Sequence, residues 1–311
     1  MKFITGHHVV ETAGARVAID EKGIRIEAAV SGSTMFGCRP VSEGGQEQKP
    51  GPMVKYCPLR SRLYGIKEET EQTIVDSVLV NIEEYGMFTG ERKIIDDKRT
   101  VSFGASEIIA DAMISGFVDC AVMVCDGAGT VLIKDPSVVL AVGAHMTGLV
   151  STSPIASTIE GLESRGCIIL DEKATINQFE GFSLAIKEGF RSIAVTIVGR
   201  EYHLAYQIKN FAKEKSVENY VIACHTTGIC GFSAEVMGKF SDIVYACASS
   251  QVRQTIAPNA KIQIGSSIPV FGMSDGGKRM ILNTASRMAE QLVISKGDIP
   301  NLNADQPRPL L

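Results

Sequence analysis

The spacing of hydrophobic positions changes along this chain. From about Gly104 onward, short runs rich in Val, Ile and Cys alternate with stretches whose apolar residues recur at helical spacing. This alternation is typical of βαβ units, in which helical crossovers join parallel strands. Strands are expected at 120–125, 167–170, 193–198, 220–224, 243–247 and 268–272. Helices are expected at 105–115, 155–165, 178–187, 202–215, 234–240 and 277–295.

The pattern predicts an α/β core over residues 101–296, with a mostly parallel, doubly wound sheet. A (β/α) barrel is the alternative, because the six strands and the earlier ones together approach eight. The run at 120–125 is apolar throughout, which favours a central strand buried on both faces.

The first hundred residues have a different pattern. In residues 9–30, apolar and polar positions alternate weakly on both sides of Asp20 to Gly23, which predicts a β-hairpin. Residues 67–84 have apolar positions at the spacing of one helix face, which predicts a helix. We expect a small β-containing subdomain at 1–100. Within it, 31–52 is rich in Gly, Pro and charge and predicts a mobile loop carrying Cys38. Residues 297–311 contain three prolines and predict a loosely held tail.

Composition narrows the class of protein. The chain of 311 residues is 45% hydrophobic, and its net charge of -4 lacks the basic excess that nucleic-acid binding requires. We therefore expect no nucleic-acid partner. The amino terminus has no signal-peptide core and no apolar run approaches the roughly 18 residues of a membrane span, which predicts a cytoplasmic protein without membrane association. The eight cysteines are then expected as reduced thiols or ligands.

Chemistry-bearing residues gather where the predicted strands end. The carboxyl ends of parallel strands form the edge at which α/β proteins bind ligands. We interpret Cys125, Asp126, Cys224 and His225 as candidate catalytic residues at this edge, with Cys247 on the neighbouring strand. Each cysteine taken alone is also explained as a small core residue.

Two kinds of chemistry remain open for these thiols. Thiolates with imidazole suit zinc or an iron–sulfur cluster, and the candidate metal ligands are Cys57, Cys125, Cys224 and Cys247. The chain has no Cys-x-x-Cys pair, so the spacing does not indicate a closed metal site. The alternative is a redox or nucleophilic thiol, whose pKa a helix amino terminus beside Cys125 or Cys224 would lower.

Glycine-rich turns supply candidate cofactor-binding residues. Backbone N–H groups after a strand can hold an anion, but a lone Gly-x-Gly is more often a tight turn, and Ser274 is equally a helix cap. His145 and Arg253 are further candidates, for the binding edge and for a substrate carboxylate or phosphate. The candidate cofactor-binding residues are Gly127, Gly129, Thr130, Thr226, Thr227, Gly228 and Ser274.

An ordered set of phrases runs through the chain: YCPL at 56–59, FGASE at 103–107, VCDGAGT at 124–130, HTTG at 225–228, CAS at 247–249 and IPVF at 268–271. Together they resemble the methanogenesis marker protein 8 family, from Val9 to about Leu292. The segment 31–52 looks like an addition to the family pattern. The resemblance implies an archaeal protein with a role beside methanogenesis, in maturing methyl-coenzyme M reductase or handling one of its cofactors.

Three functions follow as hypotheses. The first is an accessory protein or enzyme of methanogenic metabolism with a thiol-based redox or metal site, whose expected partner is methyl-coenzyme M reductase or its activation proteins. The second is a module that binds a phosphorylated or carboxylated small molecule without chemistry of its own. The third is a structural subunit that docks through the 31–52 loop. The convergence of Cys125, Cys224 and Cys247 would favour the first.

Overall fold

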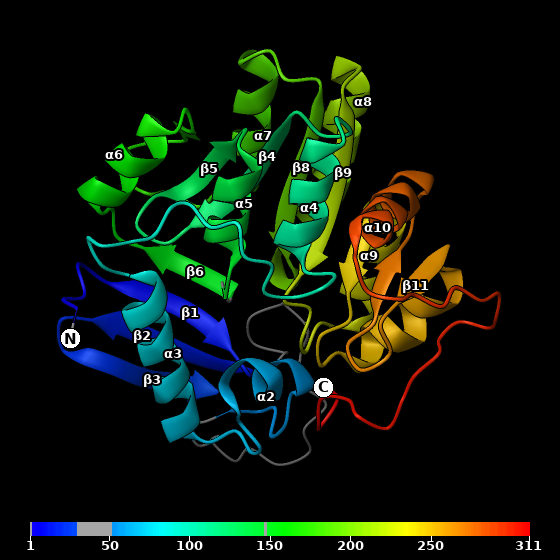
Figure 1. The fold of residues 1–311 in the computed structure, drawn as a ribbon, viewed down its shortest axis with the longest axis horizontal. Helices are drawn as coiled ribbons and strands as arrows, with labels where there is room; N and C mark the ends of the chain where they lie inside the picture. Colours follow the sequence, from blue (N-terminus) through cyan, green and yellow to red (C-terminus); the bar gives the residue numbers. More distant parts are fainter. Residues whose placement is uncertain (1, 30–51, 146–147) are drawn as a thin grey trace.

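A computed structural model describes residues 2–29, 52–145 and 148–311, and shows two β-sheets (Figure 1). The smaller sheet is antiparallel, in the order β3-β2-β1-β6. Its strands are β1 (His8–Thr12), β2 (Ala15–Asp20), β3 (Gly23–Ala29) and β6 (Gly148–Thr152). The hairpin predicted near residue 20 is β2 and β3, whereas β6 joins this sheet from far along the chain.

One amphipathic helix covers the smaller sheet. Helix α3 (Glu71–Tyr85) buries Ile74, Val78 and Ile82 against it, as the apolar stripe predicted. Thr70 and Thr73 form a capping box at its start. A short helix, α2 (Pro58–Tyr64), precedes α3 and lies between the smaller sheet and the rest of the chain (Figure 1).

Eight strands of the described residues form the larger sheet, in the order β11-β12-β10-β9-β8-β4-β5-β7. Strands β4, β8, β9 and β10 are parallel, while β5 is antiparallel to β4 and β12 to β10. The bounds are β4 Cys120–Cys125, β5 Gly129–Ile133, β7 Ile168–Ile169, β8 Ser192–Val198, β9 Glu218–Cys224, β10 Ile243–Tyr245, β11 Ile262–Ile264 and β12 Val270–Gly272.

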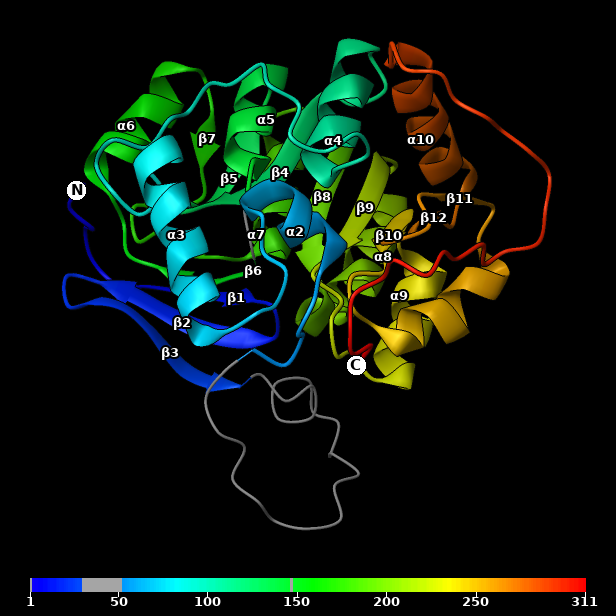
Figure 2. The same cartoon turned by 60° about the horizontal axis from the view of Figure 1, so that its bottom comes forward.

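Helices cover both faces of the larger sheet, so the predicted α/β class is confirmed (Figures 1 and 2). One face packs against α4 (Ala105–Ile114), α5 (Pro136–Gly143), α6 (Ala156–Ser164) and α10 (Asp275–Arg287). The other packs against α7 (Gln178–Lys187), α8 (His203–Lys215) and α9 (Gly231–Phe240). Within the described ranges β7 and β11 are unpaired edges, so the sheet stays open and the barrel alternative is wrong.

Strand β5 was not expected from the sequence. Residues 126–128 form a hairpin turn between β4 and β5, and Gly127 and Gly129 have φ angles of 79° and 70° that favour glycine. A Cβ at Gly129 would also clash with the Ala174 backbone. The chain after β4 therefore reverses within the sheet instead of entering a helix.

Hydrogen bonds tie the end of the predicted tail, 297–311, to the rest of the chain. Arg308 pairs with Tyr56 through backbone hydrogen bonds, and the Leu311 N–H donates to Ala248 O over 2.7 Å. Figure 2 shows this segment returning toward the stretch of chain that leads into α2. The predicted mobile loop at 31–52, with Cys38, lies outside the described residues except at Pro52. No helix in the described ranges combines the length and apolar character needed to cross a membrane.

Candidate functional site

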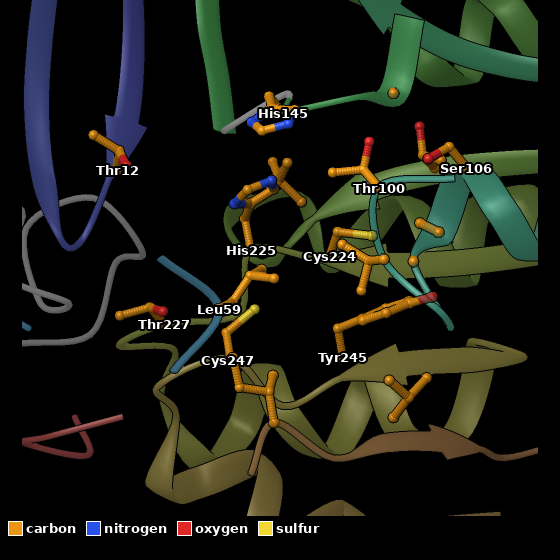
Figure 3. A pocket seen from close by; sticks show the side chains of 18 of the residues that line it. Thr12, Leu59, Thr100, Ser106, His145, Cys224, His225, Thr227, Tyr245 and Cys247 are labelled. Carbon is orange, nitrogen blue, oxygen red and sulfur yellow. The ribbon is translucent and has the colours of Figure 1, made fainter. Parts of the chain in front are cut away.

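A cavity of about 460 Å³ lies at the carboxyl ends of β8, β9 and β10. The β1–β2 turn, α2 and the loop at 100–104 complete its walls, which are mostly apolar. Ligand crevices of open α/β sheets form at this edge. Six of the sequence candidates line the cavity: Cys57, His145, Cys224, His225, Thr227 and Cys247. Figure 3 labels all of them except Cys57.

The ends of β9 and β10 have unusual backbone conformations at the cavity. His225, directly after β9, has a φ of 49°, and Cys247, two residues after β10, has a φ of 43°. Left-handed conformations are uncommon in residues other than glycine, and they concentrate at functional sites. Cys224, the last residue of β9, is half-buried, as are His225 and Cys247. Figure 3 shows the three side chains around one space.

The thiols of Cys224 and Cys247 are neutral. Burial raises the pKa of Cys224, and the nearby Cys247 raises it further. Burial likewise raises the pKa of Cys247, although hydrogen bonding from Thr226 opposes part of that shift. The lowered pKa expected at Cys224 is therefore wrong, because loss of water outweighs any stabilisation of a thiolate. At neutral pH the cavity presents thiols, which are weaker nucleophiles than thiolates.

His225 is a polar cavity residue with free hydrogen-bonding capacity. Burial, helped by the positive charge of Arg200, lowers its pKa to about 4, so the imidazole is neutral at pH 7. Among the described residues no side chain or backbone group hydrogen-bonds the His225 ring. A neutral imidazole has one donor and one acceptor, and both are available to a ligand in the cavity.

His145 also lines the cavity, and both of its ring nitrogens are hydrogen-bonded. Its Nδ1 lies 2.9 Å from the Tyr64 hydroxyl and its Nε2 lies 2.9 Å from the Tyr85 hydroxyl. Because the Tyr64 hydroxyl donates to Asn81 Oδ1, the network assigns the ring proton to Nδ1. Burial lowers the pKa of His145, so it too is neutral. Because both ring nitrogens already have hydrogen-bond partners, we interpret His145 as a structural residue of the cavity wall.

Replacing His225 with asparagine is expected to reduce the amount by which the free energy of unfolding falls at acidic pH. Between pH 6.5 and about 4 the unfolded chain binds a proton that the native His225 does not, so stability falls as pH falls through this window. The contribution is about 1–3 kcal/mol. Asparagine tolerates the left-handed conformation.

Urea unfolding at pH 7 and pH 4.5 measures this effect, with the exposed His203→Asn on α8 as a control that also removes an imidazole. If wild type and His225→Asn lose equal stability on acidification, His225 is not buried in its neutral form.

Cys125 and Asp126 lie away from the cavity walls. Cys125 is fully buried, and that burial raises its pKa. The Asp126 carboxylate is also fully buried, and it accepts hydrogen bonds from Arg92 Nε at 2.8 Å and from the Phe88 N–H at 2.7 Å. Asp126 lies directly before the hairpin turn at Gly127. Each oxygen of its carboxylate therefore has a hydrogen-bond donor within the protein.

The candidate cofactor-binding residues occupy several structural positions. Thr227 lines the cavity and accepts a hydrogen bond from the Ala248 N–H, whereas Thr226 is buried and donates to Tyr245 O. Thr130 is buried against Gln178, and Ser274 caps α10 by accepting from the Gly277 N–H. The structure does not bring the residues of the glycine turns together: Gly127, Gly129, Thr130, Gly228 and Ser274 are all absent from the cavity lining.

The candidate metal ligands divide between two places. Cys57, Cys224 and Cys247 line the cavity, while Cys125 lies near Cys167 in the core. Among the described residues, no group of three or more His, Cys, Asp or Glu side chains is arranged to hold a metal ion. These residues therefore do not fit a closed zinc or iron–sulfur site, and we derive no step through one.

Charged residues at or near the cavity were not predicted as site residues from the sequence, among them Glu11, Glu201 and the neighbouring Arg200. Burial raises the pKa of Glu11 and of Glu201, and Arg200 lies near enough to both carboxylates to oppose those shifts. Arg200 donates to Leu149 O over 2.8 Å. The Gly-Arg-Glu run at 199–201 directly after β8 was an available signal, whereas Glu11 enters from the smaller sheet, which only the fold reveals.

Residues 38–286 match the family described as uncharacterized proteins conserved in archaea (DUF2099). The chain belongs to this family. It is 37% identical over 272 residues to the uncharacterized protein MJ0054 of Methanocaldococcus jannaschii, a span that covers 87% of this chain and 95% of that protein. In this DUF2099 member the matched range includes Cys57 and the strand ends that carry Cys224, His225 and Cys247, while Glu11 and Pro307 lie outside it.

Proposed function

We propose that this protein binds a small, largely apolar and uncharged molecule in the cavity, in contact with Cys224, His225 and Cys247. One observation carries the proposal. Three side chains from two neighbouring strand ends face one apolar cavity, and the His225 ring has no partner in the described part of the chain. Mostly apolar cavities with a few convergent polar groups are the usual form of small-molecule sites.

The charges around the cavity support an uncharged ligand. Arg60 is committed to Glu69 through hydrogen bonds of 2.6 and 3.2 Å, and it also donates to Thr12 and Ser77. The nearby carboxylates of Glu11 and Glu201 oppose a ligand anion. Arg62, which is exposed and lines the cavity, and Arg200 nearby have no ion pair among the described residues, so it is the apolar walls and the two carboxylates that favour an uncharged ligand.

A saturable titration tests the proposal. N-phenyl-1-naphthylamine is a neutral apolar fluorophore whose emission rises in apolar surroundings, and we expect it to bind at one equivalent per chain. Candidate metabolites are then ranked by how well they displace it. The absence of saturable binding would count against a ligand site in this cavity.

A second candidate function is thiol–disulfide exchange, favoured by the two thiols on neighbouring strand ends. In this reaction Cys224 and Cys247 close a disulfide while a small organic disulfide is reduced to two thiols. Incubation with such a disulfide should then lower the protein mass by two hydrogens. A stable mixed disulfide, or no reaction, argues against this function.

The broader role is a proposal that rests on the sequence resemblance. We propose that the ligand belongs to methanogenic metabolism and that methyl-coenzyme M reductase, or a protein that activates it, is a partner. The relative from Methanocaldococcus jannaschii supports an archaeal context and no more. Affinity purification from a methanogen tests the partner, and failure to enrich the reductase above a control bait would count against it.

A further inference from the structure

Arg253 is a buried cation without an acidic partner. It lies on the π-helical segment η2 (Val252–Ile256), eight residues after the end of β10 at the cavity, and is 5% exposed. Its Nη1 donates to Ala246 O at 3.3 Å and to Ser249 O at 2.8 Å, and its Nε donates to Gln306 Oε1 at 3.2 Å. No ion pair involves Arg253 in the described residues. Burying an unpaired charge is costly, so its position calls for a role.

The two carbonyls that Arg253 binds flank the Cys247 turn. Cys247 lies between Ala246 and Ser249 and has the left-handed conformation, which needs support from its surroundings. The Ser249 N–H closes the same turn by donating to Ala246 O over 3.0 Å. The guanidinium therefore holds both ends of the turn that presents the Cys247 thiol to the cavity.

The same turn is tied to the segment 305–311, which we call the cover. Leu311 exchanges hydrogen bonds with Ala248 and Ser250, each 2.7 Å long, and Gln306 accepts from Arg253. Pro307 is buried and lines the cavity, while the rest of the cover is exposed or half-buried. Few buried apolar contacts hold the cover, so it is expected to open at lower cost than the core.

We propose that Arg253 is a positioning residue for the Cys247 thiol: it holds the turn that presents this thiol to the cavity and couples that turn, through Gln306, to the cover. The inference rests on the proposed function in taking Cys247 as a ligand contact. Opening of the cover then loosens the Cys247 turn, and ligand exchange and thiol presentation are linked.

Labelling each cysteine of the unliganded protein with N-ethylmaleimide, followed by mass spectrometry, tests the coupling. In Arg253→Met the Cys247 rate should rise at least about fivefold relative to Cys224, because the turn loses its two carbonyl bonds. In Gln306→Ala the cover loses its hydrogen bond to Arg253, so labelling of Cys57, Cys224 and Cys247 should speed up, with the largest increase at Cys247. Gln263→Ala, which removes hydrogen bonds to Asn301 upstream of the cover, should change no rate.

An unchanged ratio of Cys247 to Cys224 labelling in Arg253→Met would overturn the positioning role. If that variant does not fold, Gln306→Ala decides alone: a rise that is larger at Cys247 than at Cys224 supports the coupling, and unchanged rates or an equal rise at both thiols overturn it. Because these rates need no ligand, the inference can fail while probe binding persists. Loss of probe binding with normal labelling ratios would instead contradict the proposed function.

Discussion

Replacing Asp126 with asparagine is expected to lower the free energy of unfolding by about 3–5 kcal/mol, the usual cost of breaking a buried ion pair. Asp126 and Arg92 are 0% and 1% exposed at their side chains, and Nε lies 2.8 Å from Oδ1. Asparagine leaves the Arg92 guanidinium buried without a counter-charge. The Phe88 N–H, which donates to the other oxygen, also loses a charged acceptor.

Urea unfolding at pH 7 measures the loss. Asp20→Asn is the matched control, because it breaks a surface pair with Arg25 and should change stability much less. If Asp126→Asn is as stable as wild type, the buried ion pair of Asp126 with Arg92 does not stabilise the fold. Folded Asp126→Asn should still bind the apolar probe, since Asp126 does not line the cavity.

Replacing Val198 with phenylalanine is expected to weaken probe binding at least about tenfold, because forcing extra volume into an occupied space costs ~1–3 kcal/mol. Val198 ends β8, lines the cavity and pairs in register with Cys224. A ring at this position would project into the space beside the thiol. An aromatic residue is also well tolerated in a strand, so the fold should persist.

Fluorescence titration with N-phenyl-1-naphthylamine measures this loss. Val80→Phe makes the same change on the exposed face of α3, where Val80 is 37% exposed, and should leave affinity unchanged. Equal affinity of Val198→Phe and wild type would show that the probe binds outside the cavity. A loss shared by both variants would point to a general effect of the added ring.

The sequence predicted the α/β core because its signals are local. The all-apolar run of β4 and the amphipathic stripes of the later helices each follow from burial within a single element. The sequence favoured a tight turn at Gly127 and Gly129 but did not predict the hairpin from β4 to β5, because the same glycines also suit an anion-binding turn. The two kinds of turn are distinguished only by whether the residues of β5 pair with β4, which the folded structure shows.

The candidate site was predicted in part for the same reason. Cys224 and His225 were placed at the cavity by the rule that ligands bind at strand ends, and the rule needs only the strand boundaries. It failed to locate Glu11, which arrives from another sheet. It singled out Arg253 for a substrate carboxylate or phosphate, whereas the guanidinium binds two backbone carbonyls and Gln306. Contacts between residues far apart in the sequence are set by the assembled fold, which no local pattern encodes.

The central claim is that a bound apolar molecule lies against Cys224 and Cys247. The most direct measurement is the N-ethylmaleimide labelling rate at each cysteine with and without bound N-phenyl-1-naphthylamine. Bound probe should slow labelling of Cys224 and Cys247 at least about fivefold by blocking access. Cys120 and Cys125, both fully buried, should stay unlabelled in either state. Saturating probe that leaves the Cys224 and Cys247 rates unchanged would contradict the account.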